Sequence, residues 1–251
     1  MPTPSGRREW NITGRLRLAL IAALLLSGCG SVESERKVTA ADYDSFFLWA
    51  GVKPPAALDT AKSVYVLAGE VRAGDNSRFV TLRPQAPSAD HAATWLVLRV
   101  ERIDWQPQVT RQLLSELARW KAAGADVRGV QIDFDSATLH LDRYAEFLKG
   151  LKRQLPKGTR LSVTGLMDWS ANGDPKSLAK LGTVVDEVVV QTYQGRTTIP
   201  GYERYLASLS RLCLPYKVAL VDGGDWRAPA GLATDPHFKG YVVFLLPESA
   251  A

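Results

Sequence analysis

The chain has 251 residues, 46% of them hydrophobic and 23% charged, a length that suits one domain with a full hydrophobic core. Its formal net charge is +5, with 31 basic and 26 acidic residues, but the first 28 residues hold four arginines and one glutamate. The remainder therefore carries 27 basic and 25 acidic residues in no clustered basic stripe, so nucleic-acid binding is not expected.

The first 28 residues have the composition of a targeting segment. Basic residues at 7, 8, 15 and 17 precede a short apolar run over 18–26, which is too short to span a bilayer as a permanent helix. Leu26-Ser27-Gly28-Cys29 resembles the lipobox of bacterial lipoproteins, in which the cysteine is lipidated and becomes the mature N-terminus. The alternative is an ordinary signal peptide with a chance cysteine.

The lipobox resemblance implies a lipoprotein signal peptide over 1–28 and a lipid anchor at Cys29. A polar tether follows over 29–40, and the folded domain occupies 41–251. By the same resemblance, Gly30 in place of an aspartate implies the periplasmic face of the outer membrane of a Gram-negative cell envelope. Cys213 is then the only other cysteine, and we expect it to be a small buried residue.

Apolar, β-branched runs alternate with helical periods along the rest of the chain. Strands are predicted at 43–50, 63–68, 94–100, 129–133, 160–165, 187–192, 217–221 and 240–245. Helical spacing of apolar residues predicts helices at 109–123 and 141–155 and shorter ones at 175–181 and 202–214. This alternation indicates parallel strands joined by right-handed crossovers.

Eight strands and four clear helices predict an α/β fold, a small and irregular (β/α)8 TIM-like barrel. The early units are the irregular part, because 51–62 contains a Pro-Pro pair and 70–91 is rich in turn residues, with room for an extra strand near 78–82. A doubly wound open sheet is the main alternative.

The segment Arg128–Asp135 is the most informative stretch of the sequence. Residues two apart on a strand share a face, so Gln131, Asp133 and Asp135 point to one side and Val130 to the other. A strand that carries polar side chains to its C-terminal end and then leads into a helix is typical of the active-site end of such a barrel.

Tryptophans, carboxylates and amides follow several other predicted strands. An indole face packs on a sugar ring while carboxylates accept bonds from its hydroxyl groups, so this mixture indicates a sugar-binding cleft. The alternative is that these tryptophans only cap the barrel core. The expected substrate-binding residues are Trp49, Trp105, Gln131, Asp168, Trp169, Gln191, Asp222 and Trp226.

Gly129-Val130-Gln131-Ile132-Asp133-Phe134-Asp135 resembles the fourth-strand motif Asp-Gly-x-Asp-x-Asp-x-Glu of family 18 glycoside hydrolases, the chitinase-like barrels. Val190-Gln191-Thr192-Tyr193-Gln194 resembles their Met-x-Tyr-Asp segment. The resemblance implies three catalytic residues, with Asp135 at the position of the acid, Asp133 as the residue that orients the substrate acetamido group, and Tyr193 as its clamp. The whole chain also resembles an uncharacterised family of bacterial lipoproteins.

The chain departs from the family 18 pattern at four positions. Asp135 replaces the acidic glutamate, Arg128 and Gln131 replace the two upstream aspartates, and Gln194 replaces the aspartate after the tyrosine. Aspartate is one methylene shorter than glutamate, and a misplacement of about 1 Å can lower a rate on the order of a hundredfold.

Three hypotheses therefore stay open. The protein is an envelope lipoprotein that binds and hydrolyses an amino-sugar glycan, an inactive glycan-binding lipoprotein, or a scaffold whose partner is another envelope protein. A cation site built from Asp104, Asp133, Asp135 and Asp222 is disfavoured without a nearby histidine, so we expect no metal and no cofactor. The expected partners are a glycan and, through the lipid anchor, a membrane.

Overall fold

The structure, a computed structural model, describes residues 36–49, 52, 56–83, 85 and 91–246. The described residues all belong to the second of the chain's two units, residues 33–251. The predicted signal peptide and the lipidation site Cys29 lie outside the described residues.

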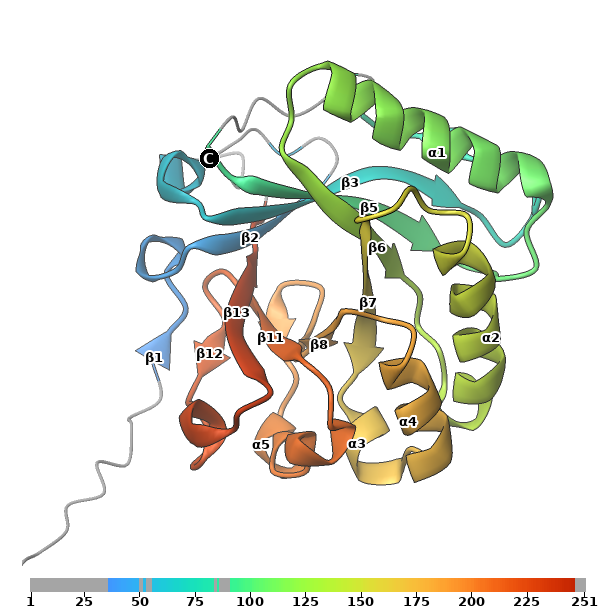
Figure 1. Ribbon diagram of the computed structural model, residues 1–251. Helices are drawn as coiled ribbons and strands as arrows, with labels where there is room; N and C mark the ends of the chain where they lie inside the picture. Colours follow the sequence, from blue (N-terminus) through green and yellow to red (C-terminus); the bar gives the residue numbers. More distant parts are fainter. Residues whose placement is uncertain (1–35, 50–51, 53–55, 84, 86–90, 247–251) are drawn as a thin grey trace, which may run out of the picture. The chain divides into compact units, whose positions relative to one another are not determined.

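Eight parallel strands close into a barrel (Figure 1). Neighbouring strands pair in chain order, and the first strand pairs with both the second and the last, which closes the ring. This closure confirms the predicted (β/α)8 architecture and excludes the open sheet. The barrel strands are β2 (Ser45–Leu48), β3 (Ser63–Val71), β5 (Ala93–Val100), β6 (Val127–Asp133), β7 (Arg160–Leu166), β8 (Glu187–Gln191), β11 (Tyr216–Val221) and β13 (Phe238–Phe244).

Helices cover the outside of the barrel unevenly. Figure 1 shows the three longest helices beside β5, β6 and β7, whereas only short helices and loops lie beside β2 and β13. None of the helices in the described part of the chain combines the length and apolar composition needed to cross a bilayer. The α-helices are α1 (Pro107–Ala122), α2 (Leu141–Lys152), α3 (Asp168–Asn172), α4 (Pro175–Gly182) and α5 (Tyr202–Leu206). The short 3-10 helices are η1 (Ala40–Asp42), η2 (Ala56–Thr60), η3 (Thr138–His140), η4 (Leu209–Leu212) and η5 (Leu232–Thr234).

The helix predicted over 202–214 is two short elements, α5 and η4, which together bury the apolar residues that suggested one helix. Cys213 follows η4 with a φ of 50°, which a right-handed helix cannot continue. Its thiol is exposed, so the expectation that Cys213 is buried is wrong.

Short strands decorate the barrel. β4 (Val80–Thr81) pairs antiparallel with β3 and confirms the extra strand predicted near 78–82. β1 (Arg36–Lys37) pairs with β12 (Asp225–Trp226), so residues assigned to the tether by sequence take part in the folded domain. β9 (Tyr193–Gln194) and β10 (Thr197–Thr198) form a small hairpin after β8.

A group of polar side chains inside the barrel bond to one another, and we call this group the interior polar layer: Tyr65, Gln131, Ser162, Glu187 and Lys217. The hydroxyl group of Tyr65 donates to Glu187 Oε1 at 2.6 Å, and Ser162 Oγ donates to the same oxygen at 3.1 Å. Gln131 Nε2 donates to Ser162 Oγ at 2.9 Å, and Lys217 Nζ lies 3.2 Å from the Tyr65 hydroxyl. These bonds satisfy a buried carboxylate, whose ionised form is costly without donors.

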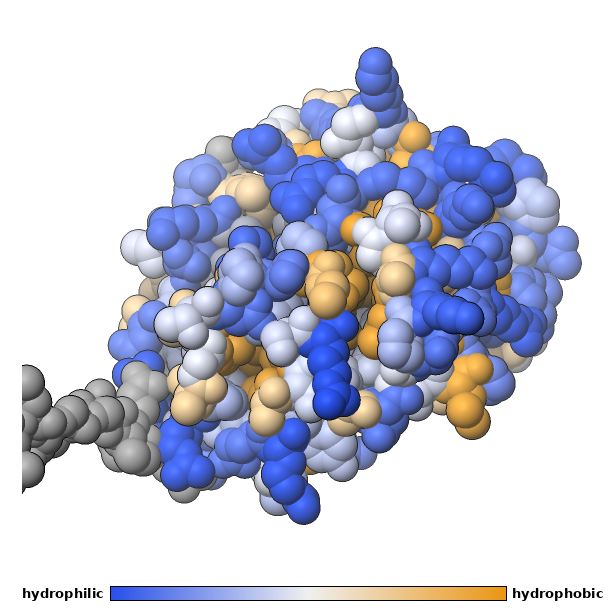
Figure 2. All heavy atoms as spheres, turned by 60° about the horizontal axis from the view of Figure 1, so that its bottom comes forward, coloured by the Kyte–Doolittle hydropathy of each residue, from blue (hydrophilic) through white to orange (hydrophobic). Residues whose placement is uncertain are grey.

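The face in Figure 2 is hydrophilic over most of its area, and its apolar residues are scattered among polar side chains. Among the described residues, Leu139 is the one large hydrophobic residue that is highly exposed, at 91%. Isolated apolar residues of this kind are normal on a protein surface.

Candidate active site

A cavity of about 530 Å³ opens at the C-terminal end of the barrel strands, within the usual size range of small-molecule sites. We call it the site cavity. It is lined by five of the residues selected from the sequence, namely Trp49, Asp133, Asp135, Gln191 and Tyr193. They come from β2, β6 and β8 or from the residues that follow these strands, so the barrel closure brings them together.

Asp133 ends β6 and has a fixed hydrogen-bond partner. Thr164 Oγ1, from the neighbouring strand β7, donates to Asp133 Oδ1 at 2.8 Å. Burial raises the pKa of Asp133 above its usual value, and the charge of Asp135 raises it further, while the Thr164 bond and the charge of Arg99 oppose the increase. The arrangement holds one carboxylate oxygen in place and leaves the other for a ligand.

Asp135 lies two residues beyond Asp133 and is largely exposed. Its carboxylate makes no hydrogen bond or ion pair with any residue that the structure describes. Asp135 and its neighbour Phe134 also line a second cavity of about 330 Å³. The carboxylate of Asp135 therefore lies at the border between two hollows.

Tyr193, in β9, combines a buried ring with an unbonded hydroxyl. The ring packs against Phe244 with centroids 5.2 Å apart, and within the described residues the hydroxyl has no hydrogen-bond partner. Burial and the charge of Asp133 hold the pKa of Tyr193 well above its usual value, so the hydroxyl keeps its proton at neutral pH. Gln191 Nε2 donates to the Tyr193 carbonyl at 2.8 Å and fixes the turn between β8 and β9.

Trp49 is the one predicted indole that lines the site cavity. The guanidinium group of Arg99 lies 5.5 Å from the centre of its ring, and Phe244 packs edge-on against it at 5.5 Å. Arg99 thus occupies one indole face, which restricts sugar stacking to the rest of the ring.

The other three predicted tryptophans lie away from the site cavity. Trp169 is buried and donates from Nε1 to the Ser136 carbonyl at 2.9 Å. Trp226 is buried and stacks on Tyr202 at 4.8 Å. Trp105 packs edge-on against Phe147 at 4.8 Å. These indoles pack with residues of the outer shell, so they do not ring the cavity as the sequence suggested.

Three predicted polar residues also lie away from the cavity lining. Gln131 has 0% exposure and belongs to the interior polar layer. One carboxylate oxygen of Asp168 accepts a hydrogen bond from Thr138 at 3.2 Å, and Asp222 accepts from the Ala40 amide at 3.1 Å. Gln131 and Asp133 point to the same face of β6, as strand alternation predicts. At about 3.3 Å per residue, Gln131 lies roughly 7 Å from Asp133 along the strand, deeper in the barrel.

Several cavity residues were not selected from the sequence. Phe47, Tyr65 and Phe244 supply half of the aromatic lining residues, and Arg99 supplies a positive charge. Each of these residues lies on a barrel strand, where side chains that point into the barrel alternate with side chains that point outward. This alternation is the sequence signal that could have identified them.

Within the described residues, no group of three or more histidine, cysteine, aspartate or glutamate side chains lies close enough together to hold a metal ion. The polar side chains that line the site cavity carry three carboxylates, two phenolic hydroxyls, one threonine hydroxyl, one amide and one guanidinium group.

Residues 96–218 match the family model described as Domain of unknown function (DUF3142). The match runs from within β5 to within β11 and includes Asp133, Asp135 and Tyr193. It confirms the expected resemblance to an uncharacterised family. No curated protein matches the chain.

Solved structures with the same fold are chitinase-like barrels and related proteins. The chitinase domain of the spore coat protein CotE from Clostridium difficile has a TM-score of 0.51 and 12% identity, covering 77% of this chain and 66% of its own. The xylanase and alpha-amylase inhibitor protein XAIP-II from Scadoxus multiflorus has a TM-score of 0.50 and 9% identity, covering 80% of this chain and 92% of its own.

The spore cortex-lytic enzyme SleL of Bacillus cereus has a TM-score of 0.46 and 18% identity, covering 75% of this chain and 52% of its own. The chain thus spans about half to two thirds of the length of SleL and the CotE domain. At these identities the likeness to the CotE domain and to XAIP-II shows the fold alone, and it confirms the expected TIM-like barrel.

Proposed function

We propose that the site cavity binds an amino-sugar glycan. The observation that carries this proposal is the convergence of Asp133, Asp135 and Tyr193 in one open cavity beside Trp49. A cavity of about 530 Å³ accommodates one or two sugar rings, and its mixture of aromatic faces with acceptors and donors matches the surface of a pyranose.

The roles that we propose for the three residues come from the resemblance to family 18 glycoside hydrolases. Asp133, fixed by Thr164, orients the acetamido group of the bound sugar, and the Tyr193 hydroxyl donates a hydrogen bond to it. Asp135 has no protein partner among the described residues and reaches solvent, so it is the residue free to protonate a glycosidic oxygen. This arrangement is the one expected for substrate-assisted glycoside hydrolysis.

The shorter side chain of Asp135 favours a second candidate, an inactive glycan-binding protein. The carboxyl group ends one methylene short of the position that a glutamate would reach, and proton transfer requires hydrogen-bond distance. We therefore propose binding as the primary function, with hydrolysis slow where it occurs.

One experiment separates the two candidates. The full chain is titrated with chitotetraose by tryptophan fluorescence and, in parallel, incubated with it and analysed for shorter products. Slow cleavage that Asp135→Asn abolishes and Asp135→Glu accelerates supports the enzyme. Binding without cleavage in all three proteins supports the inactive binder, and absence of binding across amino-sugar oligosaccharides refutes both.

We also propose that the protein is a lipid-anchored component of the bacterial cell envelope, on the periplasmic face of the outer membrane. This part rests on the sequence from Leu26 to Cys29 and the basic, apolar leader before it. Mass spectrometry of the protein from the membrane fraction tests it. The expected N-terminus is a diacylglycerol-modified Cys29, and an unmodified N-terminus elsewhere would contradict the proposal.

A further inference from the structure

The second cavity, which we call the side cavity, adjoins the site cavity along the Phe134–Asp135 segment. Both cavities are lined by these two residues. Beyond them, the side cavity is lined by Arg102, His140 and Arg143. A glycan whose linkage lies beside Asp135 therefore has room to place its next sugar unit in the side cavity.

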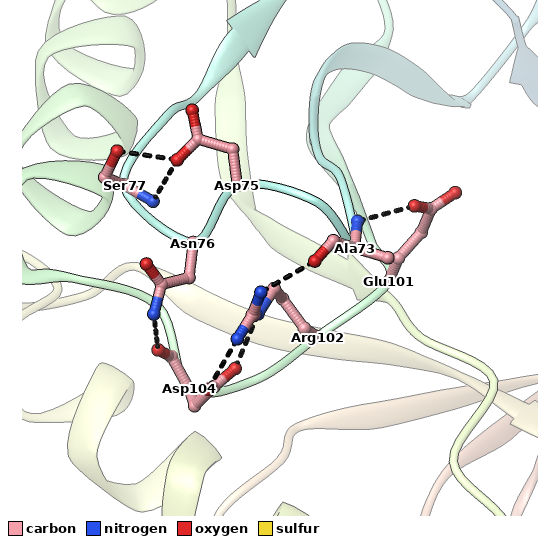
Figure 3. Close-up of polar contacts among 7 residues, drawn as sticks. All are labelled: Ala73, Asp75, Asn76, Ser77, Glu101, Arg102 and Asp104. Carbon is pink, nitrogen blue, oxygen red and sulfur yellow. Dashed lines mark hydrogen bonds and ion pairs between the residues drawn. The ribbon is translucent and has the colours of Figure 1, made fainter.

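Arg102 is held in position by a network of hydrogen bonds in the two loops shown in Figure 3. Its Nε and Nη2 donate to the two carboxylate oxygens of Asp104 at 2.7 and 2.8 Å, and its Nη1 donates to the Ala73 carbonyl at 2.6 Å. Asn76 Nδ2 in turn donates to the Asp104 carbonyl at 3.0 Å. Because a guanidinium group has five N–H donors, two remain for a ligand.

The Arg102–Asp104 pair is strong enough to lower the pKa of Asp104 to about 2, and the charge of Arg143 contributes to the decrease. Arg143 therefore lies near this pair. Its own side chain is exposed and makes no hydrogen bond or ion pair with any residue in the described part of the chain.

Two arginines and two carboxylates line the side cavity, and within the described residues one arginine and one carboxylate of this set form an ion pair. Asp104 forms an ion pair with Arg102, and Asp135 is the other carboxylate that lines the side cavity. Arg143 lines the same cavity as Arg102 and makes no ion pair with any described residue, and Arg102 keeps two N–H donors.

We propose that Arg102 and Arg143 bind the carboxylate of an acidic sugar unit, next to the unit that the site cavity holds. A planar guanidinium group matches a carboxylate in shape, and a preorganised one loses little freedom on binding. This inference rests on the proposed glycan binding and names the class of glycan: an oligosaccharide that contains N-acetylated amino sugars and carboxylate-bearing units.

Two acidic probes test the proposal with the full chain. They are a peptide-free tetrasaccharide of alternating N-acetylglucosamine and N-acetylmuramic acid and a hyaluronan tetrasaccharide, each compared with its methyl ester, with chitotetraose as neutral reference. The acid form of at least one probe is expected to bind about three- to tenfold more tightly than its ester. This preference should decrease as salt is raised from about 0.05 to 0.5 M.

Variants assign the preference to the side cavity. Arg143→Gln is expected to reduce the preference to about onefold, and Arg102→Gln is expected to reduce it as well. Arg128→Gln is the matched control, because Arg128 is an exposed arginine of β6 paired with Asp126 and lines neither cavity. It should keep the full preference.

The outcomes distinguish this inference from the proposed function. Equal affinity for both acids and their esters, with chitotetraose still bound, overturns the acidic subsite and leaves glycan binding standing. A preference that survives in Arg143→Gln also overturns it. If none of the oligosaccharides binds, both proposals fail.

Discussion

The substitution Tyr193→Phe removes a hydroxyl that has no hydrogen-bond partner among the described residues, so we expect it to weaken ligand binding and leave stability unchanged. A neutral hydrogen bond contributes about 0.5–1.5 kcal/mol, which corresponds to a decrease in glycan affinity of about twofold to tenfold. Because the ring and its packing on Phe244 stay in place, the thermal midpoint should change by less than about 1 °C.

Tyr65→Phe is the matched control, since it makes the same chemical change on another tyrosine that reaches the site cavity. The Tyr65 hydroxyl is buried and donates to Glu187 at 2.6 Å. Bonds to charged groups contribute about 1.5–3 kcal/mol, and at roughly 2–4 °C per kcal/mol the expected decrease in thermal midpoint is about 3–12 °C.

Both variants are measured by thermal unfolding and by fluorescence titration with chitotetraose. The reasoning is refuted if Tyr193→Phe lowers the thermal midpoint as much as Tyr65→Phe does, because the Tyr193 hydroxyl would then have a structural partner. Unchanged affinity in Tyr193→Phe would equally contradict its role as a ligand donor.

Three further predictions concern the carboxylates and the barrel wall. Asp135→Asn should retain most glycan affinity and lose cleavage, measured by product analysis; loss of binding with unchanged cleavage would contradict the assigned role. Burial raises the pKa of Asp133 in the folded protein, so folding takes up a proton at a pH between the unfolded and folded pKa values. The free energy of unfolding of the wild type, relative to that of Asp133→Asn, should therefore fall as pH rises from about 4 through the folded pKa. Urea unfolding across this range tests the sign, and a rising difference would reverse it. Gly129→Ala should destabilise by about 1–3 kcal/mol, because its Cβ would lie 2.5 Å from the Arg160 carbonyl oxygen, whereas Gly150→Ala, an open helical position, should stabilise by roughly 0.5–1 kcal/mol. Equal midpoints for the two glycine variants would contradict this packing.

The barrel itself could be predicted from the sequence because most of its strands are short apolar runs that contain β-branched residues. Such runs are buried on both faces, as parallel strands require, and the helical period of α1 and α2 is equally clear. The helix expected over 202–214 failed for a local reason: Cys213 and the residues around 208 leave helical geometry, although the apolar spacing continues.

The candidate site could be predicted only in part. Strand alternation placed Asp133 and Asp135 on one face, and that face opens into the site cavity. The positions of the tryptophans could not be predicted in the same way. The side-chain direction of a residue that follows a strand is no longer fixed by the alternation of side chains along that strand. Trp169 lies in the first turn of α3 and Trp226 lies in β12, and both turn toward the outer shell, where apolar area is available to bury them.

Many of the residues that line the site cavity lie within the barrel strands and not after them. Whether Phe47 or Phe244 lies above or below the barrel's polar layer depends on the stagger between strands, which the sequence of one strand does not contain. This stagger also decides that Gln131 is buried while Asp133 reaches the cavity.

The most direct test of the central claim is a crystal structure of the full chain soaked with chitotetraose. We expect electron density for a sugar ring between Asp135 and Tyr193, with its acetamido group within hydrogen-bond distance of Asp133. A saturated soak that leaves this cavity filled only by water, or that places the oligosaccharide elsewhere on the barrel, would contradict the claim that this end of the barrel recognises an amino sugar.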